Sequence, residues 1–284
     1  MILDEKQTII KCPTCGLHLH KNNEKKMFSC SNNHCFDVAK QGYVNLLMSN
    51  QSKLRIHGDS AEMLDARKSI LYGNYYKSVS DYLNKTVESI LTDKNKEYAV
   101  LDMGCGIGYY LTSLKEYLKR DNIDYHGIDI AKSGIIEATK HDKEISWVVG
   151  SSMKLPYLDN SIDVIISIFS PISESECERV LKSNGVLIVI SPNKNHLMEL
   201  KRNIYPTIIE KNYEVNELSS AVLSKINSSN VIKTIVLEKS NLKNLLLMTP
   251  HYWKTTKEAK EKFYLLDSLS ITIDVVVDEY KKIN

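Results

Sequence analysis

The sequence predicts a mostly parallel α/β sheet covered by helices on both faces, preceded by a small metal-binding module. Three observations lead to this fold class. Four of the six cysteines lie in the first 35 residues, short apolar runs alternate with amphipathic stretches from about residue 98, and one apolar run leads into a glycine-rich turn. With 284 residues, 43% of them hydrophobic, the chain can bury a sizeable core in one large and one small domain.

We expect three parts along the chain, namely a zinc-binding module at residues 1–45, a helical connector at 46–95 and an α/β domain at 96–284. The connector starts with a polar stretch around Met48–Asp59. It continues as a helical pattern from Ser60 to about Thr92, because its apolar residues recur at helical spacing.

The cysteine spacing predicts the metal site of the first part. Cys12 and Cys15 are two residues apart, and after fourteen further residues Cys30 is followed by His34 and Cys35. Two such pairs can fill the four positions of a tetrahedral structural zinc site. The spacing alone allows either His34 or Cys35 as the fourth ligand. Disulfides are the alternative, and a reducing cytoplasm disfavours them.

The α/β domain opens with a buried strand at Tyr98–Met103 that runs directly into Gly104, Gly106 and Gly108. A helix follows at Tyr109–Lys119. Glycines lack the Cβ atom that would keep a ligand away from the backbone, and the start of the helix offers free N–H groups. The turn therefore predicts a site for a polar ligand.

The next strand, at Asp124–Ile130, carries the acid that such a site needs. Asp129 lies at its end, where a carboxylate can accept both hydroxyls of a ribose. A nicotinamide site would need the pattern G-x-G-x-x-G, whereas this chain has G-x-G-x-G two residues after Asp102. The pattern therefore disfavours a nicotinamide-dependent oxidoreductase.

The alternation of strands and helices continues beyond this point. We expect further strands at Ser146–Val149, Ile162–Ile168, Gly185–Ile190, Val231–Glu238 and Ser270–Tyr280, and helices at Lys132–Lys140, Ser173–Leu181 and His196–Ile204. With the two strands already described, the count indicates a seven-stranded doubly wound sheet.

The segment Leu101–Gly108 resembles motif I of the class I S-adenosylmethionine-dependent methyltransferases, whose sheet is Rossmann-like. In that superfamily the glycine turn faces the methionine and ribose parts of the cofactor, and the acid of the second strand holds the ribose. The resemblance also implies that Ser151, after the third strand, lies near the adenine.

Longer stretches resemble the 23S ribosomal RNA guanine-N1 methyltransferase family, over essentially the whole chain. They are residues 36–47, 58–63, 66–67, 195–201 and 247–250. The resemblance implies an enzyme that transfers a methyl group from S-adenosylmethionine to N1 of a guanine in a 23S rRNA hairpin loop. It also implies a homodimer whose zinc modules flank the RNA, and one subgroup of the family is linked to macrolide resistance.

The family and the superfamily together imply a set of site residues. Zinc would be held by Cys12, Cys15, Cys30 and His34, and the cofactor by Tyr76, Asp102, Gly104, Gly106, Ile107, Asp129, Ser151 and His196. The family can carry an acid where this chain has Ile107, so only a backbone contact carries over at that position.

No catalytic residue is singled out. Guanine N1 carries a proton at neutral pH, so a base or an anion-stabilising environment is expected. The loop Phe169–Ile172, after the fourth strand of the domain, contains no carboxylate. Asp59, His196 and Glu199 are candidate bases. Candidate RNA phosphate contacts are Lys40, Lys53, Arg55, Arg67 and Lys68.

Charge and hydropathy predict where the protein is located, and two other functions remain as alternatives. The formal charge is +2, no apolar run approaches the ~18 residues of a membrane helix, and the N-terminus lacks a secretory pattern, so we expect a soluble cytoplasmic protein. A small-molecule S-adenosylmethionine-dependent methyltransferase is one alternative. The other is an rRNA-binding assembly factor with impaired catalysis.

Overall fold

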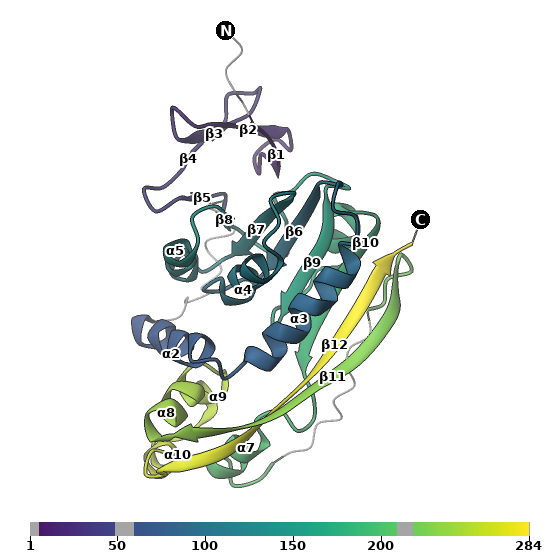
Figure 1. The fold of residues 1–284 in the computed structure, drawn as a ribbon. Helices are drawn as coiled ribbons and strands as arrows, with labels where there is room; N and C mark the ends of the chain where they lie inside the picture. Colours follow the sequence, from purple (N-terminus) through teal and green to yellow (C-terminus); the bar gives the residue numbers. More distant parts are fainter. Residues whose placement is uncertain (1–5, 49–59, 209–217, 284) are drawn as a thin grey trace.

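The computed structural model describes residues 6–48, 60–208 and 218–283. A large sheet has the strand order β11-β12-β10-β9-β6-β7-β8-β5, and a separate four-stranded sheet lies above β8 and β5 (Figure 1). In the described ranges, no helix has both the length and the apolar character needed to cross a membrane.

The small sheet is an antiparallel meander formed by the N-terminal residues. Its strands are β1 (Lys6–Lys11), β2 (His18–Asn22), β3 (Met27–Ser29) and β4 (Cys35–Asp37). Leu19 and Phe28 fill its interior. So few apolar residues give a weak core, which is why a module of this size depends on metal or on a neighbouring surface.

The small sheet is docked against the large domain by backbone pairing. The N–H of Lys11 donates to the carbonyl of Pro156 at 3.0 Å, and the N–H of Leu158 donates to that of Ile9 at 2.9 Å. Ile10, Leu19 and Phe28 share one apolar cluster with Leu155 and Tyr157. The module is therefore held by the large domain and has no separate core.

All seven strands expected in the large sheet are present. They are β6 (Tyr98–Met103), β7 (Ile123–Asp129), β8 (Ser146–Val149), β9 (Ile162–Ile168), β10 (Leu181–Pro192), β11 (Leu223–Glu238) and β12 (Ser268–Lys282). β12 runs antiparallel to both β10 and β11, and the pairs from β10 to β5 are parallel.

The expected count of seven strands is one too low. An eighth strand, β5 (Tyr43–Asn45), pairs in parallel with β8 and covers that edge of the sheet. Three residues carry too little periodicity to be recognised as a strand, so this pairing follows from the position of the N-terminal module.

The two faces of the sheet are buried differently. Alternate residues of β6 enter two separate apolar clusters, because successive side chains of a strand point to opposite faces. Helices α3 (Lys77–Ile90), α4 (Tyr109–Leu118) and α5 (Lys132–His141) contribute to one cluster. α6 (Glu174–Val180) and the zinc module contribute to the other. The zinc module thus covers part of the face on which helices alone were expected.

The helical pattern of the connector forms two helices rather than one. α2 (Ala61–Tyr72) ends at Gly73, Asn74 adopts a left-handed conformation with φ of 66°, and α3 (Lys77–Ile90) follows. A left-handed residue cannot continue a right-handed helix. The break lets α3 cross the sheet while α2 lies at the other side of the bend (Figure 1).

Three short helices between β11 and β12 were not expected from the sequence. They are α8 (Lys239–Leu247), α9 (His251–Lys254) and α10 (Lys257–Phe263), beyond α7 (Met198–Ile204) in the chain. α8 packs beside α2 (Figure 1), where Leu247 joins Met63 and Ala66 in a small buried cluster. The buried contacts of α8 are with α2, which lies far from it in the sequence.

Gly127 on β7 provides a test of this packing. A Cβ atom at this position would lie 2.3 Å from Cζ3 of the buried Trp147 ring. Because the ring has no room to retreat, Gly127→Ala should lower the free energy of unfolding by about 1–3 kcal/mol through overpacking. Urea unfolding would measure this loss. The exposed Thr92→Ala variant is the control and should change stability by less than about 0.5 kcal/mol, whereas equal stabilities would contradict the described packing.

Candidate functional site

A cavity of about 300 Å³ lies at the carboxyl ends of β6, β7 and β9. β6 is the point where the chain order of the sheet reverses, and ligands of open α/β sheets bind at such a point. The described residues that line the cavity include Arg67, Tyr76, Asp102, Gly104, Gly106, Ile107, Tyr109, Tyr110, Asp129, Phe169, Ser170 and Met248. Six of the eight predicted cofactor residues are among them.

The glycine turn forms the floor of the cavity. Gly104 and Gly106 have φ of 81° and 54°, in the left-handed region. A Cβ atom on Gly104 would lie 2.0 Å from Oγ of Ser170, so only glycine allows the turn to meet the loop after β9. A Cβ atom on Gly106 would meet nothing within 4 Å, which means that its bare backbone faces open space.

Asp129 ties this turn to the end of β7. One carboxylate oxygen accepts the backbone N–H of Gly106 at 2.9 Å, and the other accepts that of Ala131 at 2.7 Å. Each carboxylate oxygen has two lone pairs. Asp129 can therefore stabilise the turn and still accept hydroxyl groups from a ribose.

Asp102 is a buried carboxylate at the same end of the sheet. Only 2% of the residue is exposed, and its Oδ2 has no hydrogen-bond partner among the described residues. Burial, together with the nearby charge of Asp129, raises the pKa of Asp102 to about 8. An orphaned buried acid of this kind suits a ligand that carries a positive charge.

Arg67 places a positive charge in the same cavity as the Asp102 and Asp129 carboxylates. It projects from α2 and is the one basic side chain among the described residues that line the cavity. Its guanidinium also donates to the carbonyl of Met248, at 3.5 Å, which connects α2 to the end of α8. S-adenosylmethionine carries a carboxylate, an ammonium group and a ribose diol, so Arg67, Asp102 and Asp129 match its polar groups in sign and type.

Tyr76 and His196 form a buried pair behind the cavity wall. Tyr76 lines the cavity, whereas His196 does not, and the Tyr76 Oη lies 3.4 Å from Nε2 of His196. The backbone N–H of Asp274 donates to Nδ1 of His196 at 3.2 Å. Burial, and next the charge of Lys201, lower the pKa of His196 to about 4. A neutral ring whose Nδ1 accepts this bond carries its proton on Nε2, toward Tyr76.

Two of the three candidate bases, His196 and Glu199, are engaged in other contacts. Both nitrogen atoms of His196 are engaged. The carboxylate of Glu199 accepts the backbone N–H and the hydroxyl of Thr272, at 2.9 and 2.7 Å, away from the cavity. Asp59, together with Lys53 and Arg55 of the predicted RNA contacts, lies outside the described residues.

Ser151 does not line this cavity, although the N–H of the preceding Gly150 donates to the carbonyl of Asp129 at 3.0 Å. Ser151 lines a second cavity, of about 440 Å³, between the loop that carries Cys12 and the segment after β8. Lys11 and Lys154 lie in the same cavity. The role of Ser151 at an adenine therefore stays a prediction.

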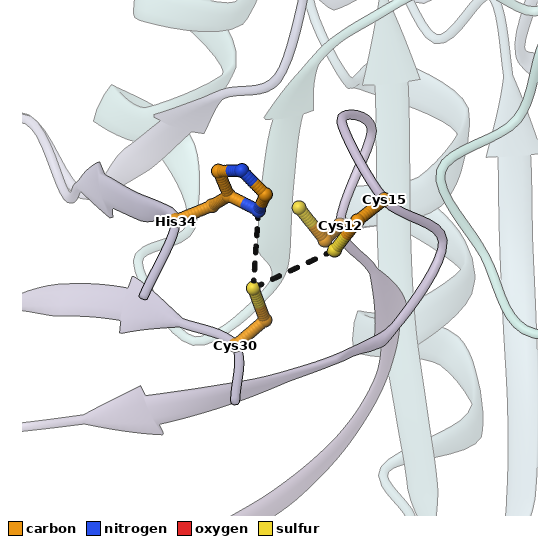
Figure 2. A group of neighbouring side chains, drawn as sticks. All are labelled: Cys12, Cys15, Cys30 and His34. Carbon is orange, nitrogen blue, oxygen red and sulfur yellow. Dashed lines mark hydrogen bonds between the residues drawn. The ribbon is translucent and has the colours of Figure 1, made fainter. Parts of the chain in front are cut away.

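The metal cluster is formed by two turns of the small sheet (Figure 2). The ligand atoms of Cys12, Cys15, Cys30 and His34 all lie within 4.8 Å of one another. Sγ of Cys30 is 3.7 Å from Sγ of Cys15 and 3.4 Å from Nδ1 of His34. A tetrahedron with zinc–sulfur bonds of about 2.3 Å has edges of roughly 3.8 Å, so these atoms fit zinc.

The structure also separates the two residues that the spacing left open. His34 points into the cluster (Figure 2), and its neighbour Cys35 is exposed at the start of β4, with its thiol directed to the carbonyl of Asn33 at 3.5 Å. The left-handed Asn33, with φ of 60°, tightens the turn between Cys30 and His34. This turn brings the imidazole back toward the thiolates.

The fold and the two sites define a class I methyltransferase with an N-terminal zinc ribbon. Residues 94–260 match the family model described as a methyltransferase domain, and residues 10–53 match the zinc-ribbon model described as RlmA, N-terminal. The chain belongs to the methyltransferase domain family.

Two relatives are similar to this chain, one over most of its length and the other over two thirds of it. A Bacillus subtilis protein, "Putative 23S rRNA (guanine-N(1)-)-methyltransferase YxjB", is 29% identical over 276 residues, which are 94% of this chain and 95% of that protein. The "23S rRNA (guanine(748)-N(1))-methyltransferase" of Streptomyces fradiae is 29% identical over 194 residues, covering 67% of this chain and 66% of its own length.

Several lining residues were not assigned to the cofactor site by the sequence. Arg67, Phe169, Ser170 and Met248 come from α2, from the loop after β9 and from the end of α8. The loop after β9 was a recognisable signal, since it follows a buried strand. No local pattern connects Arg67 or Met248 to the glycine turn, because their approach depends on how α2 and α8 pack.

The zinc cluster leads to a test with a matched pair of cysteines. Cys30→Ser should lower zinc affinity by more than about 100-fold, because even outer-shell changes cost 10–100-fold, whereas Cys35→Ser should retain the metal. Zinc content after dialysis against a chelator, measured by atomic absorption, distinguishes the two. Loss of zinc from both variants, or from Cys35→Ser alone, would contradict the ligand set.

The buried Asp102 leads to a test of pH dependence. Its pKa is raised from 3.8 to about 8, so the stability that the protonated form contributes is fully present below about pH 4 and is lost as the pH rises through 8. The free energy of unfolding of the ligand-free protein should fall by up to about 1.4 kcal/mol per pH unit in this window. Urea titrations of Asp102→Asn should show a flatter dependence, and the exposed Asp121→Asn should not.

Proposed function

We propose that this protein transfers a methyl group from S-adenosylmethionine to N1 of a guanine in a hairpin loop of 23S rRNA. The observation that carries the proposal is the presence, in one chain, of a methyltransferase cavity and an RlmA-type zinc ribbon docked on the same domain. The Bacillus subtilis relative, whose printed name gives a 23S rRNA guanine-N1 methyltransferase, matches 94% of the chain and so spans both parts.

The cofactor role of the lining residues is part of this proposal. Asp129 accepts the ribose hydroxyls, while Gly104, Gly106 and Ile107 offer the backbone of the turn. Because Ile107 is itself only 1% exposed, its side chain packs in the core and makes no polar contact. The backbone contact is the one that carries over from the family.

The charged groups orient the amino-acid end of the cofactor. Asp102 pairs with the ammonium group, and Arg67 pairs with the carboxylate. Tyr76 closes the wall, held in place by the neutral His196 behind it. The bound cofactor supplies an electrophilic methyl group, and the protein residues chiefly position that group and exclude water.

The zinc ribbon, residues 1–45, serves RNA recognition in this proposal, residues 46–95 connect it, and residues 96–284 carry the catalysis. Lys25, Lys26 and Lys40 are exposed and can contact phosphates without reading sequence. Since the ribbon is docked on the large domain by backbone hydrogen bonds, an RNA loop bound to it would lie on the same domain as the cavity. We also propose the cytoplasm as the location and a homodimer as the assembly, by the family resemblance, and macrolide resistance where that subgroup applies.

Methylation of rRNA is the direct test. The zinc-loaded protein, supplied with methyl-labelled S-adenosylmethionine and unmodified 23S rRNA, should label the RNA and produce one reverse-transcription stop at a hairpin-loop guanine, because N1-methylation blocks base pairing. Asp129→Ala should lower cofactor affinity by roughly 10-fold or more, since it removes a charge-assisted acceptor. Absence of label in both naked rRNA and ribosomal particles, with cofactor binding intact by calorimetry, would contradict the proposal and favour a small-molecule acceptor.

A further inference from the structure

Phe169 stands out among the cavity residues because its ring is exposed. It follows β9 directly, and 44% of its surface is accessible, whereas the preceding Ile168 is 8% exposed. Its φ of 53° lies in the left-handed region, which side chains other than glycine, asparagine and aspartate rarely adopt. A bulky apolar residue is thus held outward in an unfavourable backbone conformation.

The surrounding contacts hold this conformation in place. The N–H of Phe169 donates to the carbonyl of Ile190 on β10 at 3.0 Å, and the hydroxyl of Ser167 donates to the carbonyl of Ser170 at 3.3 Å. Ser170 in turn occupies the space beside Gly104. The loop after β9 is therefore locked to both the sheet and the glycine turn, and strain that is held so firmly commonly marks a functional position.

The ring of Phe169 rests on two other aromatic rings. Its centroid lies 5.6 Å from that of His196, at an interplanar angle of 35°, and 6.2 Å from that of Tyr76, at 85°. These two rings are buried, so they support Phe169 from the protein side. Because Phe169 also lines the cavity and is 44% exposed, it is accessible to a ligand there.

The position of Phe169 in the sheet separates it from the cofactor's ribose. β6 lies between β7 and β9 in the sheet (Figure 1). Asp129 at the end of β7 and Phe169 after β9 both line the cavity, so they lie on the two sides of β6. With the ribose held at Asp129, the side near Phe169 is left for the acceptor. A flat aromatic surface there suits a flat acceptor.

We infer that Phe169 is the stacking platform for the acceptor base, a guanine taken out of its loop stack. This inference rests on the proposed function and adds the residue that positions the base. Aromatic rings bind unstacked bases through their faces. Phenylalanine has no hydrogen-bonding group, so it orients the guanine plane and leaves N1 and its neighbours free toward the methyl group. Discrimination between bases then falls to other groups.

The test compares binding of RNA with binding of cofactor. Phe169→Ala should raise the KM for the rRNA substrate roughly 5- to 150-fold, the range for loss of one stacked base. Calorimetry should show an affinity for S-adenosylmethionine within about 2-fold of the unsubstituted protein. Phe169→Trp should restore the KM, since it keeps an aromatic face. Met153→Ala, another exposed apolar side chain but outside the cavity, is the matched control.

Phe169→Leu distinguishes stacking from simple packing. It keeps apolar volume without an aromatic face, so it should behave like the alanine variant. An unchanged KM for RNA in Phe169→Leu, or a loss confined to cofactor affinity, would overturn the inference. If the unsubstituted protein fails to methylate rRNA, the proposed function fails instead, and the two failures are therefore told apart by the same assay.

Discussion

The hydrogen bond from Gly106 to the Asp129 carboxylate is the constraint on which the candidate site depends. It joins the turn after β6 to the end of β7 at 2.9 Å and leaves the turn's bare backbone facing the cavity. The same turn needs glycine at position 104 to meet Ser170, so the loop after β9 is placed by it as well. The turn after β6 thus connects three strand ends around a single space.

The zinc ribbon is the second determinant, because it is part of the body of the enzyme. β1 pairs with the segment after β8, and the apolar residues of the ribbon complete a face of the sheet with α6. The ribbon that a bound zinc would organise therefore also covers part of the large sheet. The second cavity, which Lys11 and Lys154 line, lies between the ribbon and the segment after β8.

The charges at the site are distributed according to burial. Asp102 is orphaned and has a raised pKa, whereas Asp129 is held by two N–H groups. His196 is kept neutral behind Tyr76, so the aromatic wall of the cavity carries no charge of its own. A cationic cofactor would meet the acids at the glycine turn, and a neutral base would meet Phe169, which rests on Tyr76 and His196.

The sequence by itself determined the features that depend on neighbouring residues: the seven long strands through their apolar runs, the glycine turn, the acid at position 129 and the cysteine spacing. Only the tertiary structure decided that β5 adds an eighth strand, that Asn74 splits the connector, and that Arg67, Phe169 and Met248 meet at one cavity. The physical reason is the separation in sequence between the residues that specify each feature. A strand or a tight turn is specified by the next few side chains, whereas a cavity wall is specified by the packing of segments up to 181 residues apart, as between Arg67 and Met248.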